Sequence, residues 1–488
     1  MSLAPRSSIR CSAHLRAGSS LSASKRPFWR RPIARWLAVL SVVLVIAWFR
    51  RASTRPELLW HVPTPIVAAI VVGDDVDGDG TPDVYISRTG WSTVEQSGEF
   101  RTPSEFWTDL RLLSGANGST VWSVELPGER GHRLRLASDA AFDFDEDGVS
   151  DLLLAEYEWR GKPARGGRFS VVSGRTGERL RLVCDGVAGD RTGFSVCLLA
   201  PAPNGGRAIA VVGAIQSSAF DTDHSMRARI HYDAEGFATR TDEPDPSPHL
   251  GPGFVTAFDL GSGAQLWRVE GESLGDLFGY SLCRLPDLDG DGIPDIAVGA
   301  PLADTFGGEA GEVRILSGAT GAPLAVIGPT DEERSRRGDR HEELRRYWTA
   351  RFGFSLAWAP ASEVNGEALL GIAGCNSVWF AQLRGTDFQL ERVREKREVR
   401  GFPWISLLQD TDGDELPELL TGEDATWFCE LGTHSRAAVI ESASGDVAWR
   451  LPSLPDCGNL GVTPARPPGS AERWFVLAST DGIRCYRY

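Results

Sequence analysis

The sequence predicts an all-β fold, a seven-bladed β-propeller with EF-hand-like Ca²⁺ loops, preceded by one N-terminal transmembrane helix. Three observations carry this prediction. An Asp-rich loop occurs four times, each copy directly ahead of an apolar strand. A β-hairpin pattern also recurs, as in FSVVSGRTGERLRLV at 169–183. A long apolar stretch lies ahead of these repeats, at 33–49. Recurrence of one strand-and-turn unit is typical of propellers and related arrays.

The chain begins with a basic segment followed by the apolar one. Residues 1–32 contain seven Lys and Arg side chains and no acid, and we expect a cytoplasmic tail. Residues 33–49 (IARWLAVLSVVLVIAWF) reach the short end of the length that a membrane-spanning helix needs. Only three basic residues follow before residue 56, so the positive-inside bias places the propeller outside the cytoplasm, periplasmic or extracellular. The alternatives are a cleavable signal peptide, for which AWFRRAS offers no small-residue cleavage site, and a transit peptide.

The four Asp-rich loops share one spacing, and we number them loops 1 to 4 along the chain. Carboxylates stand at positions 1, 3, 5 and 9, and Gly stands at position 6 in the first three. Alternating carboxylates on a tight loop point at one centre, and a hard dication such as Ca²⁺ requires such an oxygen cage. The spacing is that of an EF-hand loop cut short. The expected ligands are Asp75, Asp77, Asp79 and Asp83 in loop 1; Asp143, Asp145, Asp147 and Asp151 in loop 2; Asp287, Asp289, Asp291 and Asp295 in loop 3; and Asp410, Asp412, Asp414 and Glu418 in loop 4.

A single such loop could be a plain Asp/Gly turn, because Asp caps its own backbone, but the recurrence favours metal binding. We expect up to four Ca²⁺ ions. The 410–418 site should be the weakest, because Glu415 occupies the position where Gly tolerates a positive φ. Crowded carboxylates repel one another until metal arrives, so the expected role is structural rather than catalytic. The backbone carbonyls at position 7 should complete each cage: Thr81, Val149, Ile293 and Leu416.

Each repeat supplies four strands, which is the content of one propeller blade. First strands near residues 70, 138, 194, 280, 353, 404 and 460 give seven blades over 57–488. The last repeat ends after its third strand. Residues 57–62 (ELLWHV) resemble the fourth strands of other repeats, such as QLWRVE at 265–270. We therefore expect this strand to close the last blade and remove an exposed sheet edge.

One repeat carries a recognisable signature. Phe278-Gly279 and Gly299-Ala300-Pro301 spell FG…GAP around loop 3, and Phe352-Gly353 gives a partial second copy. These residues resemble the FG-GAP (VCBS-like) repeats of the integrin α-subunit head. The resemblance implies a seven-bladed propeller with Ca²⁺ loops between strands one and two on one face. It also implies partner binding on the opposite face, built from the loops after strands two and four.

Long insertions at 87–109, 215–253 and 329–350 are the expected partner-binding loops. Aromatic residues on loops over a rigid scaffold are common at interfaces. Residues 56–488 hold 40 of the 51 basic side chains and all 66 acidic ones, which disfavours nucleic acid as a partner. The insertions carry Trp91, Phe106, Trp107, His224, His231, Tyr232, Tyr347 and Trp348.

The function predicted from these features is that of a membrane-anchored, extracytoplasmic Ca²⁺-binding module that binds a protein or glycan ligand. One alternative is a Ca²⁺-dependent polysaccharide lyase or hydrolase, which requires a cleft where groups such as Asp221, Asp223, His224 and His231 converge. Another is a purely structural scaffold. No catalytic residue is expected, because Ser195, Ser281 and Ser355 lack the second Gly of a nucleophile elbow and occupy equivalent repeat positions.

The eight cysteines show no zinc-binding spacing. In an exported domain, Cys184–Cys197 or Cys429–Cys457 could form disulfides. Buried free thiols remain the alternative, because Cys197 and Cys283 occupy equivalent points of two apolar strands.

Overall fold

The computed structural model describes most of the chain from residue 56 onward. The predicted tail at 1–32 and the apolar stretch at 33–49 lie outside the described residues, and residues 55–488 form a compact unit by themselves. Within the described part of the chain, no helix is long and apolar enough to cross a membrane. The described ranges are 56–64, 67–93, 103–126, 132–138, 142–158, 166–199, 207–216, 230–232, 238–240, 251–306, 310–329, 351–359, 368–374, 377–383, 393–396, 404–408, 417–423, 434–441, 447–451, 454–455, 463–465, 474–479 and 482–487.

The described residues form seven antiparallel sheets, each with a main path of four strands, which we number blades 1 to 7. Blade 1 contains β2 (Val67–Val72), β3 (Val84–Thr93), β4 (Pro103–Leu113) and β5 (Thr120–Leu126). Blade 2 contains β6 (His132–Ser138), β7 (Leu152–Glu158), β8 (Arg168–Val172) and β9 (Arg179–Asp185). Blade 3 contains β10 (Thr192–Leu199), β11 (Ile209–Ala214), β14 (Phe254–Asp259) and β15 (Gln265–Glu270). Blade 4 contains β16 (Ser281–Arg284), β17 (Ile296–Ala300), β18 (Glu312–Leu316) and β19 (Pro323–Ile327). Blade 5 contains β20 (Ser355–Ala359), β21 (Ala368–Gly374), β22 (Ser377–Leu383) and β23 (Val393–Lys396).

Blade 6 contains β24 (Ile405–Leu407), β25 (Leu419–Glu423), β26 (His434–Ile440) and β27 (Val447–Arg450), with β28 (Leu454–Pro455) also pairing with β26. Blade 7 contains β29 (Thr463–Ala465), β30 (Trp474–Ser479), β31 (Gly482–Arg487) and β1 (Glu57–Val62). A separate two-stranded sheet, β12 (Ile230–Tyr232) with β13 (Ala238–Arg240), lies in the insertion of blade 3.

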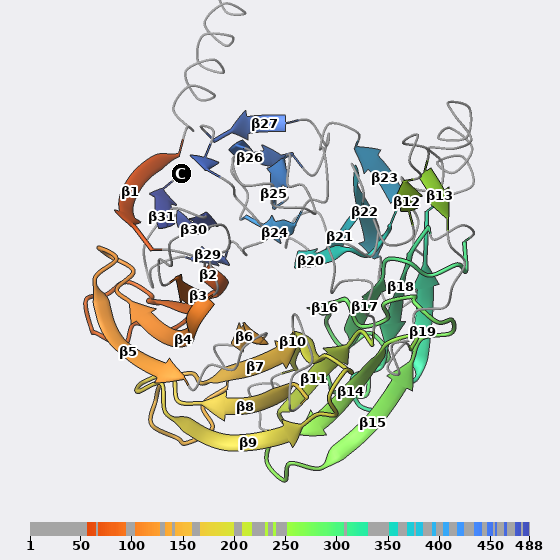
Figure 1. The fold of residues 1–488 in the computed structure, drawn as a ribbon, viewed down its shortest axis with the longest axis horizontal. Coiled ribbons are helices and arrows are strands. Elements are labelled where there is room, and N and C mark those ends of the chain that lie inside the picture. Colours follow the sequence, from red (N-terminus) through yellow and green to blue (C-terminus); the bar gives the residue numbers. More distant parts are fainter. Residues whose placement is uncertain are drawn as a thin grey trace, which may run out of the picture. The chain divides into compact units, whose positions relative to one another are not determined.

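The blades are arranged in a closed ring (Figure 1). The first strand of each blade contacts the first strand of the next, in the order β2, β6, β10, β16, β20, β24, β29 and back to β2. The seven-bladed all-β propeller expected from the repeats is thus confirmed.

The ring is closed by pairing the two ends of the propeller. β1 runs antiparallel to β31, with Trp60 opposite Cys485. The Arg487 guanidinium also donates a 2.6 Å hydrogen bond to the Glu57 carboxylate. β1 therefore occupies the outer edge of blade 7, the position expected from its sequence.

The strands within a blade differ in burial. All five residues of β17 are buried, because neighbouring blades cover both faces of an inner strand. The outermost strand of blade 3, β15, alternates instead, and Trp267 is its one buried residue. This difference explains why the second strands read as continuous apolar runs, whereas the fourth strands alternate polar and apolar residues.

The repeated serines join neighbouring blades. The Ser195 hydroxyl donates to the carbonyl of Gly279 at 2.6 Å, and the Ser281 hydroxyl donates to that of Gly353 at 2.7 Å. A Cβ on Gly299, opposite Ser281, would lie 2.1 Å from the Gly353 carbonyl oxygen, so only glycine fits there. These serines are structural, as their repeat positions indicate.

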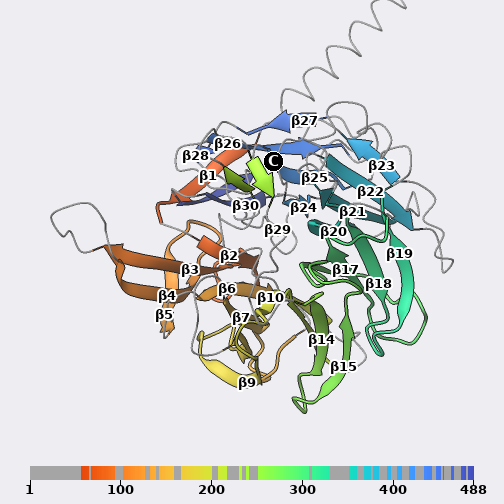
Figure 2. The same ribbon diagram turned by 45° about the vertical axis from the view of Figure 1, so that its right-hand side comes forward.

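The prediction that residues 87–109 form a loop is wrong in part. Residues 87–93 and 103–109 continue β3 and β4 as a paired hairpin that extends past β2 (Figure 2). The aromatic and β-branched residues of this stretch favour strands, because their side chains pack well on a pleated surface. Trp107 belongs to β4, where the Arg88 guanidinium lies 5.0 Å from its ring centroid.

Residues 94–102 lie outside the described residues, as do most residues of the other two insertions, including 217–229 and 330–350. Among the described cysteines, Cys184, Cys197, Cys283 and Cys485 are free thiols, so the Cys184–Cys197 disulfide is not formed. Cys429 and Cys457 lie outside the described part.

Candidate metal centres

Loops 1, 2 and 3 are described in full, and each connects the first two strands of its blade. Loop 1 joins β2 to β3, loop 2 joins β6 to β7, and loop 3 joins β16 to β17. Because first strands occupy equivalent places in the ring, the three loops lie at the same edge of their blades. In loop 4, residues 410–416 lie outside the described residues, so the positions of Asp410, Asp412, Asp414 and Leu416 are not described. Glu418, its ninth residue, is buried and directly precedes β25.

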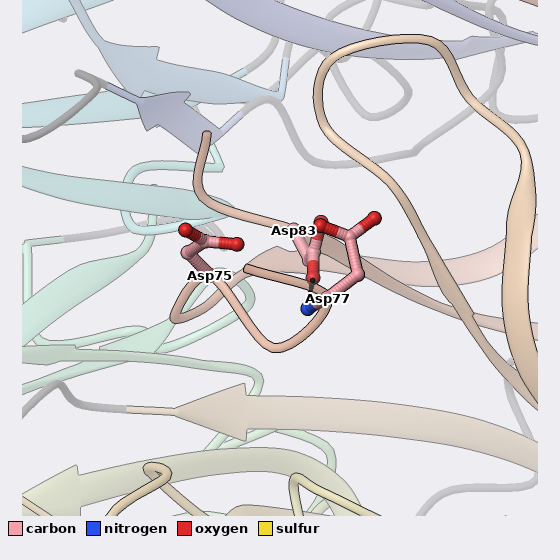
Figure 3. Close-up of side chains that lie close together, drawn as sticks. All are labelled: Asp75, Asp77 and Asp83. Carbon is pink, nitrogen blue, oxygen red and sulfur yellow. Dashed lines mark hydrogen bonds between the residues drawn. The ribbon is translucent and has the colours of Figure 1, made fainter. Parts of the chain in front are cut away.

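In loop 1, side-chain oxygens of Asp75, Asp77 and Asp83 lie within 4.8 Å of one another (Figure 3). The loop backbone orients them. Asp75 accepts hydrogen bonds from Gly78 N at 2.7 Å and from Gly80 N at 2.7 Å. The fourth carboxylate, Asp79, accepts from Thr81 N at 2.8 Å and from the Ser114 hydroxyl at 3.0 Å.

Loop 3 repeats these contacts. Asp287 accepts from Gly290 N at 2.7 Å and from Gly292 N at 2.8 Å, and Asp291 accepts from Ile293 N at 2.8 Å. The carboxylates that lie within 4.8 Å of one another here are Asp287, Asp289 and Asp291. In loop 2 the corresponding group is Asp143, Asp145 and Asp151.

The loop conformation depends on residues with positive φ. Position 6 has φ near +90° in all three loops, as its glycine predicts: Gly80, Gly148 and Gly292. Position 4 also has positive φ, although its spacing in the sequence showed no sign of this. Loops 1 and 3 place glycine there, whereas loop 2 places Glu146 at φ +59°, a conformation that costs free energy for a residue with a Cβ.

The ninth residue of each loop is a buried carboxylate. Asp295 accepts from Leu288 N at 2.7 Å and from Gly318 N at 3.0 Å. Burial raises the pKa of Asp295 to about 6, although these two hydrogen bonds oppose the rise. Asp83 has the same environment, with its pKa raised to about 6 by burial, and burial raises the pKa of Asp151 as well. A cation beside these carboxylates would compensate for the cost of burying their charge.

The ninth carboxylate also connects each loop to the preceding blade, a contact that the sequence analysis missed. Gly318, which donates to Asp295, lies in the hairpin turn between β18 and β19, and its carbonyl accepts from Trp267 Nε1 at 2.9 Å. Trp267 lies on the outer strand of blade 3. In the same way, Gly115 donates to Asp83 and accepts from Trp60 of β1 at 2.8 Å. The recurring Ser-Gly of the turns and the recurring Trp were the signals for this contact.

The residues fit a hard dication. The potential metal-ligand atoms that converge in each loop are carboxylate oxygens. Such ligands suit Ca²⁺ or Mg²⁺ and not the metals that prefer thiolate or imidazole. The N–H groups of Thr81, Val149 and Ile293 bind the position-5 carboxylates. Ligation by their carbonyls remains a prediction.

The ring of four-stranded blades and the Asp loops at strand connections define a propeller of FG-GAP type. The FG-GAP repeat family matches residues 278–316, which run from the Phe of the FG pair through loop 3 to the end of β18.

The chain is also similar to integrin alpha-PS2 of Drosophila melanogaster, with 33% identity over 109 residues. The aligned part is 21% of this chain and only 7% of the integrin chain. The chain thus contains an integrin-alpha-like FG-GAP propeller.

Proposed function

We propose that this protein is a membrane-anchored propeller that binds Ca²⁺ through its Asp loops and a protein ligand through its opposite edge, outside the cytoplasm. One observation carries the metal part of the proposal. In each of loops 1, 2 and 3, three carboxylates have side-chain oxygens within 4.8 Å of one another. Like charges held so close repel, unless a cation lies among them.

Bound Ca²⁺ would supply positive charge, and residues of the chain hold the carboxylates in place around it. In loop 3, backbone N–H groups hold the carboxylates of Asp287 and Asp291, and Asp295 ties the loop to the turn at Gly318. Occupancy of the loop would thereby stabilise the contact between blades 3 and 4. The metal would contribute to the rigidity of the ring and would not take part in a reaction.

The proposed ligand edge lies at the other end of the strands. The connection from β9 to β10 exposes Val187, and that from β15 to β16 exposes Leu274, with 64% and 71% of their surfaces accessible. These exposed apolar side chains, on connections of two successive blades, are available to a protein partner. A glycan is the alternative ligand. The residues named for a hydrolase or lyase (Asp221, Asp223, His224) lie outside the described residues, as does the side chain of His231.

A calorimetric Ca²⁺ titration of the full-length chain tests the proposal. We expect binding at three or more sites and a higher melting temperature, with weaker binding of Mg²⁺, which demands tighter octahedral geometry. Absence of both binding and stabilisation would refute the metal role. Protease accessibility of the propeller in intact and permeabilised cells tests the anchor, and digestion only after permeabilisation of the cytoplasmic membrane would contradict the proposed topology.

A further inference from the structure

Loop 2 differs from loops 1 and 3 in a contact that lies outside the loop itself. Arg175 lies in the hairpin turn between β8 and β9. Its Nε donates to Asp147 Oδ2 at 2.9 Å, and its Nη2 donates to the main-chain oxygen of Asp147 at 2.8 Å. Asp147 is the position-5 carboxylate of loop 2. A cation supplied by the chain therefore already holds one of the expected metal ligands.

The turns of blades 1 and 4 have the same geometry without this cation. Each has a Ser-Gly pair whose glycine N–H donates to the ninth carboxylate of its loop: Gly115 to Asp83, Gly174 to Asp151 and Gly318 to Asp295. The residue after this glycine is Ala116 in blade 1, Arg175 in blade 2 and Ala319 in blade 4. Arginine is thus a feature of loop 2 and is not required by the turn.

Both carboxylate oxygens of Asp147 accept hydrogen bonds from N–H groups. Its other carboxylate oxygen, Oδ1, accepts from Val149 N at 2.9 Å. In loop 3 the position-5 carboxylate Asp291 lies within 4.8 Å of the carboxylate oxygens of Asp287 and Asp289. In loop 1 the position-5 carboxylate Asp79 accepts from the Ser114 hydroxyl, a neutral donor, so loop 2 alone among these three loops has its position-5 carboxylate held by a cation. Arg175 and Asp147 remain partly accessible, with 47% and 24% of their side-chain surfaces exposed, so the ion pair can open without unfolding the blade.

Resting on the Ca²⁺-binding function proposed above, we propose that Arg175 is a built-in counter-cation that holds loop 2 at a lower Ca²⁺ affinity than loops 1 and 3. The guanidinium repels an arriving dication and has to leave the Asp147 carboxylate before that oxygen can serve as a ligand. Glu146 adds a carboxylate to loop 2, but it lies at position 4 with a strained backbone, whereas Arg175 pairs with the expected ligand itself. Loops 1 and 3 therefore fill first, and loop 2 fills at higher Ca²⁺ concentration.

Reciprocal substitutions in the full-length chain test this inference by calorimetric titration with Ca²⁺ alone. R175A gives loop 2 the residue found in blades 1 and 4 and should tighten its binding roughly tenfold, since site charge tunes the affinity of such loops. A319R transfers the guanidinium to loop 3 and should weaken that site by a similar factor. D143N identifies the weaker class of sites in the wild-type titration, because that class should disappear in the variant.

A second readout needs no metal. In the presence of chelator, R175A should lower the melting temperature, because the loop 2 carboxylates lose their counter-charge, and A319R should raise it. Equal affinity of the three loops in the wild type, or an unchanged titration of R175A, would overturn the counter-cation role while leaving Ca²⁺ binding intact. Absence of Ca²⁺ binding in every variant would instead refute the proposed function on which this inference rests.

Discussion

Blades 3 and 4 are built alike but differ in their strand connections. In both, the first strand carries a serine opposite a glycine of the second strand, Ser195 with Gly213 and Ser281 with Gly299, and the serine hydroxyl donates to the next blade. Only blade 4 has carboxylates between these strands, because residues 200–206 of blade 3 read APAPNGG. A blade of this fold therefore forms without an Asp loop.

This difference separates two tasks within one repeat. Glycine, serine and the apolar strands are shared by both blades and assemble the ring, whereas the carboxylates of loop 3 are an addition that blade 3 lacks. Burying Asp295 in fact opposes folding when no cation is present, as the raised pKa indicates. Carboxylates retained at such a cost point to a ligand, and four experiments test this separation.

Removal of Ca²⁺ should have the largest effect. A ligand at 100 times its dissociation constant stabilises the folded state by about 2.7 kcal/mol per site, so three loops would contribute roughly 8 kcal/mol. Thermal unfolding of the full-length chain with Ca²⁺ and with chelator measures this difference. Hydrogen exchange should slow on Ca²⁺ addition in blade 4 around loop 3 and change little in the β10–β11 pair of blade 3. If Ca²⁺ slowed hydrogen exchange equally in both blades, the proposed difference between blade 4, with its Asp loop, and blade 3, without one, would be contradicted.

Alanine in place of Gly213 or Gly299, the second-strand glycines opposite the serines, should destabilise the two blades to a similar extent. A Cβ on Gly213 would lie 2.2 Å from Ser195 Oγ, and one on Gly299 would lie 2.3 Å from Ser281 Oγ. We expect each substitution to lower the free energy of unfolding by roughly 3 kcal/mol through overpacking, with or without Ca²⁺. Denaturant unfolding measures the loss. Gly261→Ala is the matched control, because its Cβ would meet a single atom at 3.4 Å.

The pH dependence of stability should change sign with metal. Without cation, the pKa of Asp295 is about 6 in the folded state and about 4 in an unfolded chain. Its protonated form is thus favoured by folding, and stability should fall as pH rises from 4 through 6. With saturating Ca²⁺, stability should instead rise with pH near 4 and then level off, because protons and metal compete for the carboxylate and the unfolded carboxyl has a pKa of about 4. Melting temperatures in matched buffers test both slopes, and D295N should flatten them in part.

Removing a tryptophan hydrogen bond between the outer parts of two blades should have the smallest effect on the free energy of unfolding. Trp267 Nε1 donates to the Gly318 carbonyl, whereas Trp122 Nε1 is buried without a partner among the described residues. The carbonyl of Gly174, at the place corresponding to Gly318, accepts from the Tyr85 hydroxyl instead. Trp267→Phe should therefore cost about 1–2 kcal/mol more than Trp122→Phe, because only the former loses a hydrogen bond. Equal costs in chemical denaturation would show that packing alone matters there.

Much of the fold could be predicted because the chain repeats itself. Seven first strands and the likeness of Glu57–Val62 to other fourth strands were enough to define the ring. The extension of β3 and β4 over 87–93 and 103–109 was missed, because an aromatic-rich stretch between two strands of a repeat reads as an insertion whether it pairs or not. Strand pairing there depends on residues 84–93 meeting 103–113, which periodicity alone does not reveal.

The candidate sites were predictable to a smaller extent. Spacing identified the carboxylates and the position-6 glycines, because these are local features. The contact from Trp267 to Gly318 joins residues 51 positions apart, and Arg175 reaches Asp147 from 28 positions away. Such contacts depend on where the ring places each turn, so they required the three-dimensional structure.

The pairing of β1 with β31 also constrains the order of folding. Glu57 and Arg487, joined by a hydrogen bond, are 430 positions apart in the chain. During synthesis the first strand emerges early and lacks its partner until the last strand is available, while the other blades assemble from local hairpins. Ring closure is consequently the contact of highest sequence separation and should be a late, slow step in folding. A ribosome-stalled chain that ends before residue 482 should therefore contain ordered blades but an unpaired, protease-sensitive β1.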